Sequence, residues 1–249
     1  MTMLAGKVAF VTGSNAGLGR CIVNHFAAAG ARGIGLDIND EQPALPDGWE
    51  PLQGDVADNA SLTSAIAKIK REYGRLDIVV ANAGLVPPWR ETENLDFAEW
   101  DQVFAVNVRG VAATISLALP LMRQTGGSII AMASLNSHRA HSRQCLYTAT
   151  KHAVLGIVRS VALDVGRFGI RVNALGPGPV ATEALLERVQ QRAQDGGPAV
   201  QDALDAFASD AALGRMATAD DVARVALFLA SEQSSGVTGQ LYPIDAGLP

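Results

Sequence analysis

The stretch that decides the fold is KVAFVTGSNAGLG, residues 7–19. Residues 7–12 are apolar and β-prone, which predicts a short buried strand. A glycine-rich turn follows, and a helical pattern then continues to Ala29, where Gly30 ends it. Residues 33–37 form the next apolar run and finish on an acid. Together these features predict a β–α–β unit with a glycine-rich first turn.

The glycines of this turn, Gly13, Gly17 and Gly19, are spaced G-x-x-x-G-x-G rather than G-x-G-x-x-G. The physical reasons for glycine are the same with either spacing. Glycine permits the turn and lets the backbone approach a pyrophosphate, while the helix N-terminus supplies N–H donors and a positive dipole. A glycine turn alone is often only a tight turn. The strand before it, the helix after it and Asp37 at the end of the next strand favour a dinucleotide site.

The rest of the chain continues to alternate between strands and helices. Further strands are expected at residues 50–54, 76–81, 129–134, 170–175 and 240–244. Helices are expected at residues 59–73, 97–123 (with Pro120 as a candidate break) and 145–168, as two short helices within 183–211, and from Thr218 onward. This alternation predicts the α/β class: one domain over residues 1–249, with a parallel sheet of about seven strands and helices on both faces.

Composition narrows the function. Hydrophobic residues make up 48% of the 249 residues, so the chain can bury a large core. The net charge of −5, with both signs mixed along the chain, argues against a nucleic-acid partner. Cys21 and Cys145 have neither metal-type nor disulfide-type spacing, which fits a reducing compartment and no metal. We see no signal sequence and expect no membrane-spanning run, so we predict a cytoplasmic protein without a membrane partner.

A second stretch carries residues suited to proton transfer. Tyr147 and Lys151 are four residues apart, so on a helix they share one face, and Ser134 ends a strand close enough in sequence for a loop to return it to the tyrosine. A nearby lysine lowers the pKa of a phenol, which can then exchange a proton with an alcohol or a carbonyl oxygen. The serine can hold the same oxygen, and the hydride requires a redox cofactor. Tyr and Lys at this spacing are common on solvated helix edges, so this interpretation depends on the dinucleotide site.

Over essentially its whole length, the sequence resembles the short-chain dehydrogenase/reductase family. The resemblance rests on the joint, ordered occurrence of Thr12-Gly13-x-x-x-Gly17-x-Gly19, Asp55, Asn82-Ala83-Gly84, Asn107, Ser134, Tyr147-x-x-x-Lys151 and Pro177-Gly178. It implies a Rossmann-type doubly wound sheet and a nicotinamide-dependent oxidoreductase. A cofactor-binding sensor that has lost its chemistry is the rival class, but such proteins usually lack the Tyr or the Lys that this chain has.

The resemblance implies a catalytic tetrad of Asn107, Ser134, Tyr147 and Lys151. Tyr147 would be the acid/base, and Ser134 would position the substrate oxygen. Lys151 would tune the tyrosine and hold the nicotinamide ribose, and Asn107 would hold a water in a proton relay behind the lysine. Considered without the resemblance, Asn107 is better explained as a polar residue inside a helix that bonds to backbone.

The resemblance also implies contacts with the cofactor at several strand ends. The implied cofactor-binding residues are Gly13, Asn15, Gly17, Leu18, Gly19, Asp37, Asp55, Val56, Asn82, Gly84, Tyr147, Lys151, Pro177, Val180 and Thr182. Among them, Asp55 and Val56 would touch the adenine. Val180 and Thr182 would bind the nicotinamide carboxamide.

The cofactor is predicted to be NAD rather than NADP. Asp37 lies 24 residues after Gly13, close to the spacing of a ribose-binding acid, although a strand-end acid can also simply face solvent. A carboxylate there accepts hydrogen bonds from ribose hydroxyls and repels a 2′-phosphate. We expect no compensating cation, because residues 14–16 of the turn are uncharged and Arg32 begins the strand at its far end.

The predicted reaction interconverts a secondary alcohol (a polyol, a sugar or a hydroxylated small molecule) and its ketone. A 3-oxoacyl-thioester reductase that uses NADPH is the alternative. Candidate substrate residues are Ser134, Asn136, His141, Gln144 and Tyr147. A polar pocket for a hydroxylated or acidic substrate and an ordinary solvated loop both fit the segment after Ser134. Trp89 either forms a pocket wall or covers the underside of its loop.

Two further expectations concern motion and assembly. Residues 181–212 are rich in Ala and Gln and are interrupted by Gly196-Gly197-Pro198, so we expect a lid that closes over the substrate. From the family we expect a homotetramer with two-fold symmetry. Apolar residues of the 145–168 helix could face a partner as well as the sheet, namely Leu155, Val158, Val161, Ala162 and Val165.

Overall fold

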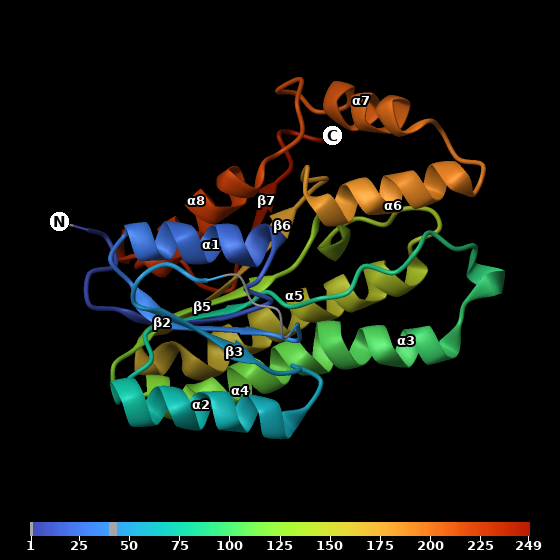
Figure 1. The fold of residues 1–249 in the computed structure, drawn as a ribbon. Helices are drawn as coiled ribbons and strands as arrows, with labels where there is room; N and C mark the ends of the chain where they lie inside the picture. The colour runs from blue at the N-terminus through green and yellow to red at the C-terminus, as the bar shows by residue number, and fades with distance from the viewer. Residues whose placement is uncertain (1, 40–43) are drawn as a thin grey trace.

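The computed structural model describes residues 2–39 and 44–249, and within them seven strands form one parallel sheet (Figure 1). The strands are β1 (Val8–Thr12), β2 (Arg32–Asp37), β3 (Trp49–Gln53), β4 (Ile78–Ala81), β5 (Gly127–Met132), β6 (Ile170–Pro177) and β7 (Leu241–Ile244). Their spatial order is β3-β2-β1-β4-β5-β6-β7. The order reverses between β1 and β4, which makes this the switch point of a doubly wound sheet. The predicted fold class is confirmed.

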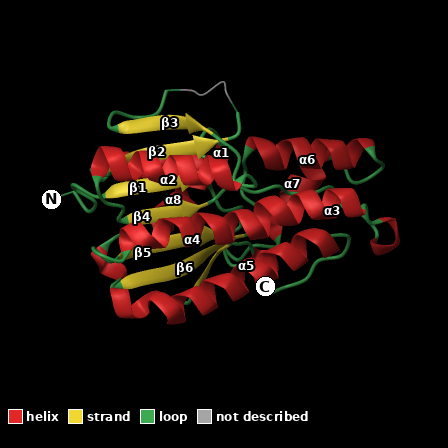
Figure 2. Ribbon diagram, turned by 90° about the horizontal axis from the view of Figure 1, so that it is seen from below, coloured by secondary structure: helices red, strands yellow, loops and turns green. Residues whose placement is uncertain are grey.

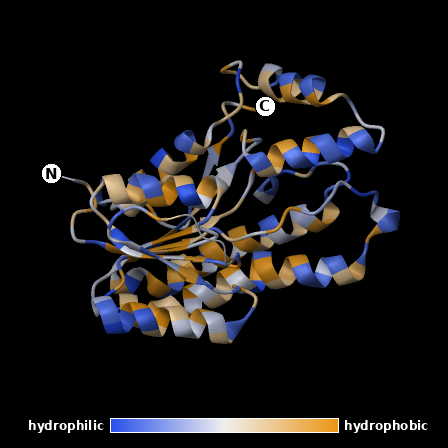
Figure 3. Ribbon diagram, viewed as in Figure 1, coloured by the Kyte–Doolittle hydropathy of each residue, from blue (hydrophilic) through white to orange (hydrophobic). Residues whose placement is uncertain are grey.

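Helices cover both faces of the sheet. Helices α1 (Gly17–Ala28) and α8 (Ala219–Ala230) pack on one face. On the other face lie α2 (Asn59–Tyr73), α4 (Val111–Met122) and α5 (Cys145–Val165), as Figure 2 shows. The strands between them are mostly apolar (Figure 3), since a parallel sheet with two covered faces must exclude water from both. All five residues of β1, for example, are buried.

The remaining helical segments are short or lie at the edge of the molecule. They are η1 (Thr92–Asn94), α3 (Phe97–Phe104), η2 (Ala105–Gly110), η3 (Leu135–Ser137), η4 (Gly166–Phe168), α6 (Glu183–Gln194), α7 (Val200–Ser209) and η5 (Glu232–Ser234). Two of the longer helices begin with an acidic or hydroxyl cap, because Asp58 accepts from the backbone of α2 and Thr218 from that of α8.

The long helix expected over residues 97–123 is continuous but irregular. Helix α3 continues through the π-helical turn η2 into α4, and Pro120 lies inside α4 rather than breaking it. The helix ends only two residues later, at Met122, where a proline costs one backbone hydrogen bond near an end that already leaves carbonyls unpaired. The helix expected over 145–168 ends at Val165, and η4 follows it.

The run Phe97–Met122 has the length and hydropathy of a membrane-spanning helix, contrary to our sequence expectation that no such run exists. Within it, Val103, Val111, Ile115, Ala118 and Met122 are buried. The last four belong to the cluster that packs against the sheet. Core helices of globular domains meet the same criteria of length and composition.

The apolar residues of α5 do not divide between sheet and partner as we expected. Leu155, Val158, Ala162 and Val165 are all buried in the core cluster of this chain, and Val161 is half-buried against it. Among the exposed residues of α5 is one large apolar side chain, that of Leu163, which is 87% exposed. The four buried residues follow the three-to-four-residue spacing of one helix face, so they point to the sheet together.

Helices α6 and α7 form the segment expected to be a lid. Figure 1 shows them beyond the carboxyl ends of the strands, above α3 and α5. Among the residues of these two helices, only Val189 and Ala203 are buried. Few buried apolar residues hold them to the body of the molecule, so we expect them to open more easily than the core helices α4 and α5.

Candidate active site

Tyr147 and Ser134 meet at the carboxyl end of β5. Ser134 is 7% exposed, and its side chain lies close enough to Tyr147 to lower the pKa of the phenol. The serine is itself held by η3, because its hydroxyl accepts the Asn136 N–H at 3.2 Å and its own N–H donates to the Ser137 hydroxyl at 3.2 Å. This capping box turns the chain just after the strand and aims the serine at the tyrosine.

Lys151 lies one turn after Tyr147 on α5, with its ammonium 5.5 Å from the centre of the tyrosine ring. It is 4% exposed and donates a hydrogen bond of 2.8 Å to the carbonyl oxygen of Met132. Burial lowers the pKa of Lys151 to about 8. Part of its population is therefore neutral just above neutral pH, and an anion or an acceptor nearby would favour the charged form.

Burial raises the pKa of Tyr147, since a phenolate loses water there. The hydrogen bond from Ser134 and the positive charge of Arg188 act in the opposite direction and lower the pKa of Tyr147. We expected Lys151 to be the tuning cation, but the positive charge that lowers the pKa of Tyr147 in this structure is that of Arg188, from the lid helix α6. The tuning role of Lys151 stays a prediction.

Asn107 lies in the π-helical turn η2 and is completely buried. Its amide oxygen accepts the Leu85 N–H at 2.7 Å, and its amide nitrogen donates to the Leu85 carbonyl oxygen at 2.8 Å. A longer contact of 3.4 Å reaches the Thr150 hydroxyl. The residue thus fastens the loop that follows β4. Its role in a proton relay stays a prediction.

The glycine turn has the shape that a dinucleotide needs. Gly13 and Gly17 have φ values of 66° and 53°, and a Cβ on Gly17 would meet nothing within 4 Å, so the turn is open on that side. A Cβ on Gly19 would lie 1.9 Å from the Gly13 carbonyl oxygen, so only glycine lets α1 begin this close to β1. The turn and the N-terminus of α1 therefore form a cradle for phosphates.

Two side chains of this turn are buried without partners. The hydroxyl of Ser14 and both amide atoms of Asn15 accept or donate no hydrogen bond among the described residues. Buried polar groups are almost always paired, so such atoms fit a site completed by a ligand. Beside them, Asp37 accepts the Asn15 N–H at 2.9 Å, which places the carboxylate against the turn. These residues fit a nicotinamide dinucleotide.

Asn82 joins the glycine turn to the end of β4. Its amide nitrogen donates to the carbonyl oxygens of Thr12 and Gly13 at 2.9 and 3.0 Å. Gly84 follows two residues later, and a Cβ placed there would lie 3.8 Å from the Lys151 ammonium. The segment after β4 thus connects the glycine turn with the lysine. Doubly wound sheets bind ligands at this switch point, outside the carboxyl ends of β1 and β4.

The other implied cofactor residues line the same edge of the sheet. Asp55 accepts the Ala57 N–H at 2.8 Å, and Val56 is buried beneath Gly110 of η2. Val180 is buried and bridges to Ala217. Thr182 is the N-cap of α6, with its hydroxyl 3.3 Å from the Leu185 N–H. The remaining two, Leu18 in the first turn of α1 and Pro177 at the end of β6, lie at that edge as well.

Comparisons with known proteins agree with this arrangement. Residues 13–249 match the model of the family described as Enoyl-(Acyl carrier protein) reductase. Dehydrogenase/reductase SDR family member 6 of Aquarana catesbeiana is 34% identical, over 99% of each chain. This chain belongs to the short-chain dehydrogenase/reductase family.

Two further similarities show the breadth of this short-chain dehydrogenase/reductase family. The 3-oxoacyl-[acyl-carrier-protein] reductase FabG of Thermotoga maritima is 33% identical over 98% of each chain. The solved structure of carveol dehydrogenase from Mycobacterium avium, in complex with NAD, has a TM-score of 0.90, with 31% identity over 99% of each chain. The protein is an oxidoreductase of the short-chain dehydrogenase/reductase type.

The predicted substrate residues of this dehydrogenase do not all come together. Asn136 is buried and donates to Gln144 at 3.0 Å and to the Thr148 hydroxyl at 2.9 Å, so both amides brace the segment between Ser134 and α5. Because these amide groups already bond to each other and to Thr148, fewer of their donors and acceptors are left for a substrate than we expected. His141 lies on the exposed part of the same segment.

Two arginines near the site were missed by the sequence analysis. Arg188 and Arg192 come from α6 and lie over the indole of Trp89, with the guanidinium carbons 4.2 and 5.2 Å from the ring centre. Their spacing of four residues, which puts both on one helix face of the lid, was the signal available in the sequence. Trp89 is therefore a pocket wall.

A third group of residues lies away from this site, and we expected no metal in the chain. Cys21, His25 and Asp220 place potential metal-ligating atoms within 4.8 Å of one another. His25 is already 2.6 Å from the Asp220 carboxylate, which also pairs with Arg224. The carboxylate is thus already engaged by His25 and Arg224, and we assign no ligand to this cluster.

Proposed function

We propose that this chain is an NAD-dependent dehydrogenase that interconverts a secondary alcohol and its ketone. One observation carries the proposal: Ser134 and the buried Lys151 both lie beside Tyr147, and Lys151 is also next to Gly84, in the segment that Asn82 fastens to the glycine turn. This is an acid/base group and an oxygen-binding group at the place where a nicotinamide would end.

The residues of this chain would divide the work as follows. Ser134 and Tyr147 would hold the substrate oxygen between them, and in alcohol oxidation Tyr147 would take the hydroxyl proton. Lys151 and Arg188 would stabilise the resulting negative charge. The cofactor supplies the acceptor for the hydride that leaves the alcohol carbon. The lid would exclude water from the reacting atoms.

The choice of NAD is supported by Asp37. Its carboxylate lies against the glycine turn, where it can accept hydrogen bonds from a ribose and would repel a 2′-phosphate. The NAD complex of carveol dehydrogenase, a relative of similar fold, is consistent with this choice. Arg20 of α1, which we did not consider as a cation for this site, donates a hydrogen bond of 2.5 Å to the carbonyl oxygen of Ala44, in the segment between β2 and β3.

A panel of secondary alcohols, polyols and ketones, assayed with NAD(H) and NADP(H), tests the proposal. We expect alcohol oxidation with NAD, followed by the absorbance of the reduced nicotinamide. The similarity to the 3-oxoacyl-[acyl-carrier-protein] reductase makes a 3-oxoacyl thioester the necessary competitor in the panel. Faster reduction of that thioester with NADPH would favour the second function. Tight NAD binding without turnover of any compound would point to a cofactor sensor.

A further inference from the structure

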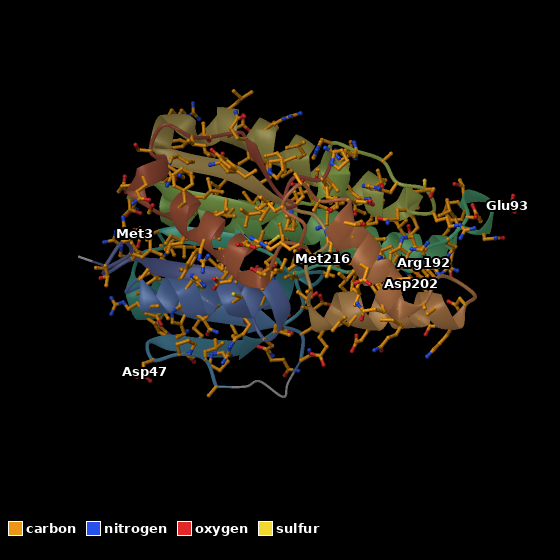
Figure 4. All side chains as sticks on the ribbon, turned by 90° about the horizontal axis from the view of Figure 1, so that it is seen from above. Met3, Asp47, Glu93, Arg192, Asp202 and Met216 are labelled. Carbon is orange, nitrogen blue, oxygen red and sulfur yellow. The ribbon has the colours of Figure 1, made fainter. Side chains whose placement is uncertain are left out.

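A cavity of about 400 Å³ lies between the lid helix α6 and the loop after β4. Its wall includes Trp89 and Arg90 from the loop and Arg188 and Arg192 from α6. A smaller neighbouring pocket shares Arg90 with it and is lined by Tyr147. Figure 4 labels Arg192 at this end of the molecule, beyond the sheet. The cavity is therefore large enough for a small molecule and opens next to the acid/base residue.

Four arginines line this cavity, and two of them are neutralised by neighbouring acids. Arg90 pairs with Glu99 at 3.2 Å, and Arg143 pairs with Glu91 at 2.5 Å. These two pairs join the loop after β4 to α3 and to the segment before α5. These two ion pairs therefore hold the cavity walls in place even when no ligand is bound.

Arg188 and Arg192 are different, because neither forms an ion pair with any acid in the described part of the chain. The remaining acid of the cavity wall, Asp195, accepts a hydrogen bond from Gln191 at 3.2 Å instead. Two uncompensated positive charges thus face the cavity from one helix. Both guanidinium groups lie over Trp89, so their positive charges repel each other. An anion bound between them would offset this repulsion.

The environment of Arg188 makes an anionic ligand favourable. Its guanidinium carbon lies 4.2 Å from the centre of the Trp89 ring, and this contact with the aromatic ring uses none of its N–H donors in an ion pair. Its Nε is buried and has no hydrogen-bond acceptor among the described residues. Burial also lowers the pKa of this arginine, which shows that its charge is poorly solvated. A buried cation without a partner is costly, and a carboxylate would satisfy both its charge and its donors.

The position of Arg188 also limits the distance between the anion and the reacting carbon. The cavity lined by Arg188 shares Pro88, Arg90 and Arg143 with the small pocket lined by Tyr147. An anion bound by Arg188 therefore lies in the cavity next to the hydroxyl that Tyr147 would deprotonate. A short chain with a hydroxyl and a carboxylate meets this requirement, and the guanidinium edge matches a planar carboxylate with two parallel hydrogen bonds.

We infer that the substrate is a small hydroxy acid, whose carboxylate is bound by Arg188 and Arg192 while Tyr147 takes the proton of its hydroxyl. This inference rests on the proposed function and extends it by naming the substrate class. In the reaction, the carbinol carbon loses a hydride to NAD, the hydroxyl loses its proton to Tyr147, and the hydroxy acid becomes the corresponding oxo acid. The carboxylate itself is unchanged.

The first test compares matched substrates with the NAD-loaded enzyme. Short hydroxy acids are assayed beside their methyl esters and beside the plain secondary alcohols of the same length. We expect kcat/KM to be about 10²-fold higher for the acids, since removing one member of a buried charge pair has effects of this order. Equal efficiency for acids and esters would overturn the inference and leave the alcohol dehydrogenase function intact. Preference for a phosphorylated hydroxy compound over every acid would overturn it as well.

The second test uses variants of the arginine. Arg188→Met keeps the length of the side chain and removes the charge, so KM for the hydroxy acids should rise by about 10²-fold, while neutral alcohols change little in KM. Arg188→Lys should restore part of the affinity, because it keeps the charge without the planar fork. Arg71→Met, on the exposed surface of α2, is the matched control. An equal rise in KM for acids and neutral alcohols in Arg188→Met would contradict a carboxylate-binding role.

The third test does not depend on turnover. Calorimetric titration of the NAD-loaded protein with short monocarboxylates should show binding in the wild type and much weaker binding in Arg188→Met and in Arg192→Met. This measurement separates the two proposals, because it detects the carboxylate site even if no alcohol in the panel is oxidised. Absence of binding to the wild type, or equal binding to all three proteins, would sink the inference.

Discussion

The amino group of Lys151 donates a hydrogen bond of 2.8 Å to the carbonyl oxygen of Met132. Met132 is the last residue of β5, and Ser134 follows two residues later. The bond therefore joins the helix that carries Tyr147 to the strand that presents Ser134. The relative position of the three reacting groups is fixed by the sheet rather than by a flexible loop.

The first prediction concerns the acid/base residue. Tyr147→Phe keeps the ring and removes the proton carrier, so turnover should fall by about 10²-fold or more. The affinity for NAD, measured by titration, should change little. Tyr242→Phe on β7 is a suitable control with unchanged turnover. Wild-type turnover in Tyr147→Phe would remove the tyrosine from the mechanism.

The second prediction concerns the pH dependence of stability without cofactor. Lysine has an ordinary pKa of 10.5, and burial lowers that of Lys151 to about 8. Between these values the unfolded chain binds a proton that the folded chain does not, so this group makes the free energy of unfolding rise as the pH increases from about 8 to about 10.5. Denaturant unfolding of the wild type should show this rise relative to Lys151→Met. Parallel pH curves for the two proteins would mean that the amine is not buried as described.

The third prediction concerns cofactor choice. We expect kcat/KM to be at least about 10²-fold higher with NAD than with NADP, which is about 2.7 kcal/mol. Asp37→Ala should reduce this ratio, mainly by weakening the use of NAD. Arg20→Met is assayed beside it, because Arg20 is a cation of α1 that donates to the carbonyl oxygen of Ala44, in the segment after β2. Equal efficiency with both cofactors in the wild type would end the prediction.

The fourth prediction concerns the lid. Because α6 and α7 bury only Val189 and Ala203, their amides should exchange hydrogen faster than those of α4 and α5 in the free protein. NAD together with a substrate should slow this exchange by closing the lid over the site. Strong protection of α6 and α7 in the free protein would argue for a permanently closed lid.

The fifth prediction concerns assembly. We expect a homotetramer from the family resemblance, and the exposed apolar side chains of Leu163 on α5 and Phe97 on α3 would gain from burial in an interface. Light scattering at working concentration measures the mass directly. Leu163→Glu should shift the distribution toward smaller species if this face is used. A monomer mass for the wild type would refute the tetramer.

The fold and most of the reacting groups could be read from short stretches of the chain. The run from Lys7 to Asp37 predicts a strand, a glycine turn, a helix and a strand-end acid, because each signal depends on neighbouring residues and their backbone geometry. The spacing of Tyr147 and Lys151 places both on one helix face for the same reason. The errors were of the same local kind: Pro120 does not break α4, which ends two residues after it, and η2 adds a π-helical turn that no pattern showed.

Contacts between distant segments could not be read in this way. Trp89 and Arg188 are 99 residues apart, and only the packing of α6 over the loop after β4 brings one onto the other. The same packing leaves Arg188 without an acid among the described residues, whereas Arg90 and Arg143 find theirs. Local patterns determined the geometry of the cofactor turn and the helix face that Tyr147 and Lys151 share, because residues close together in the chain set both. The tertiary structure alone decided which charges stay uncompensated beside Tyr147, because that depends on how separate elements pack.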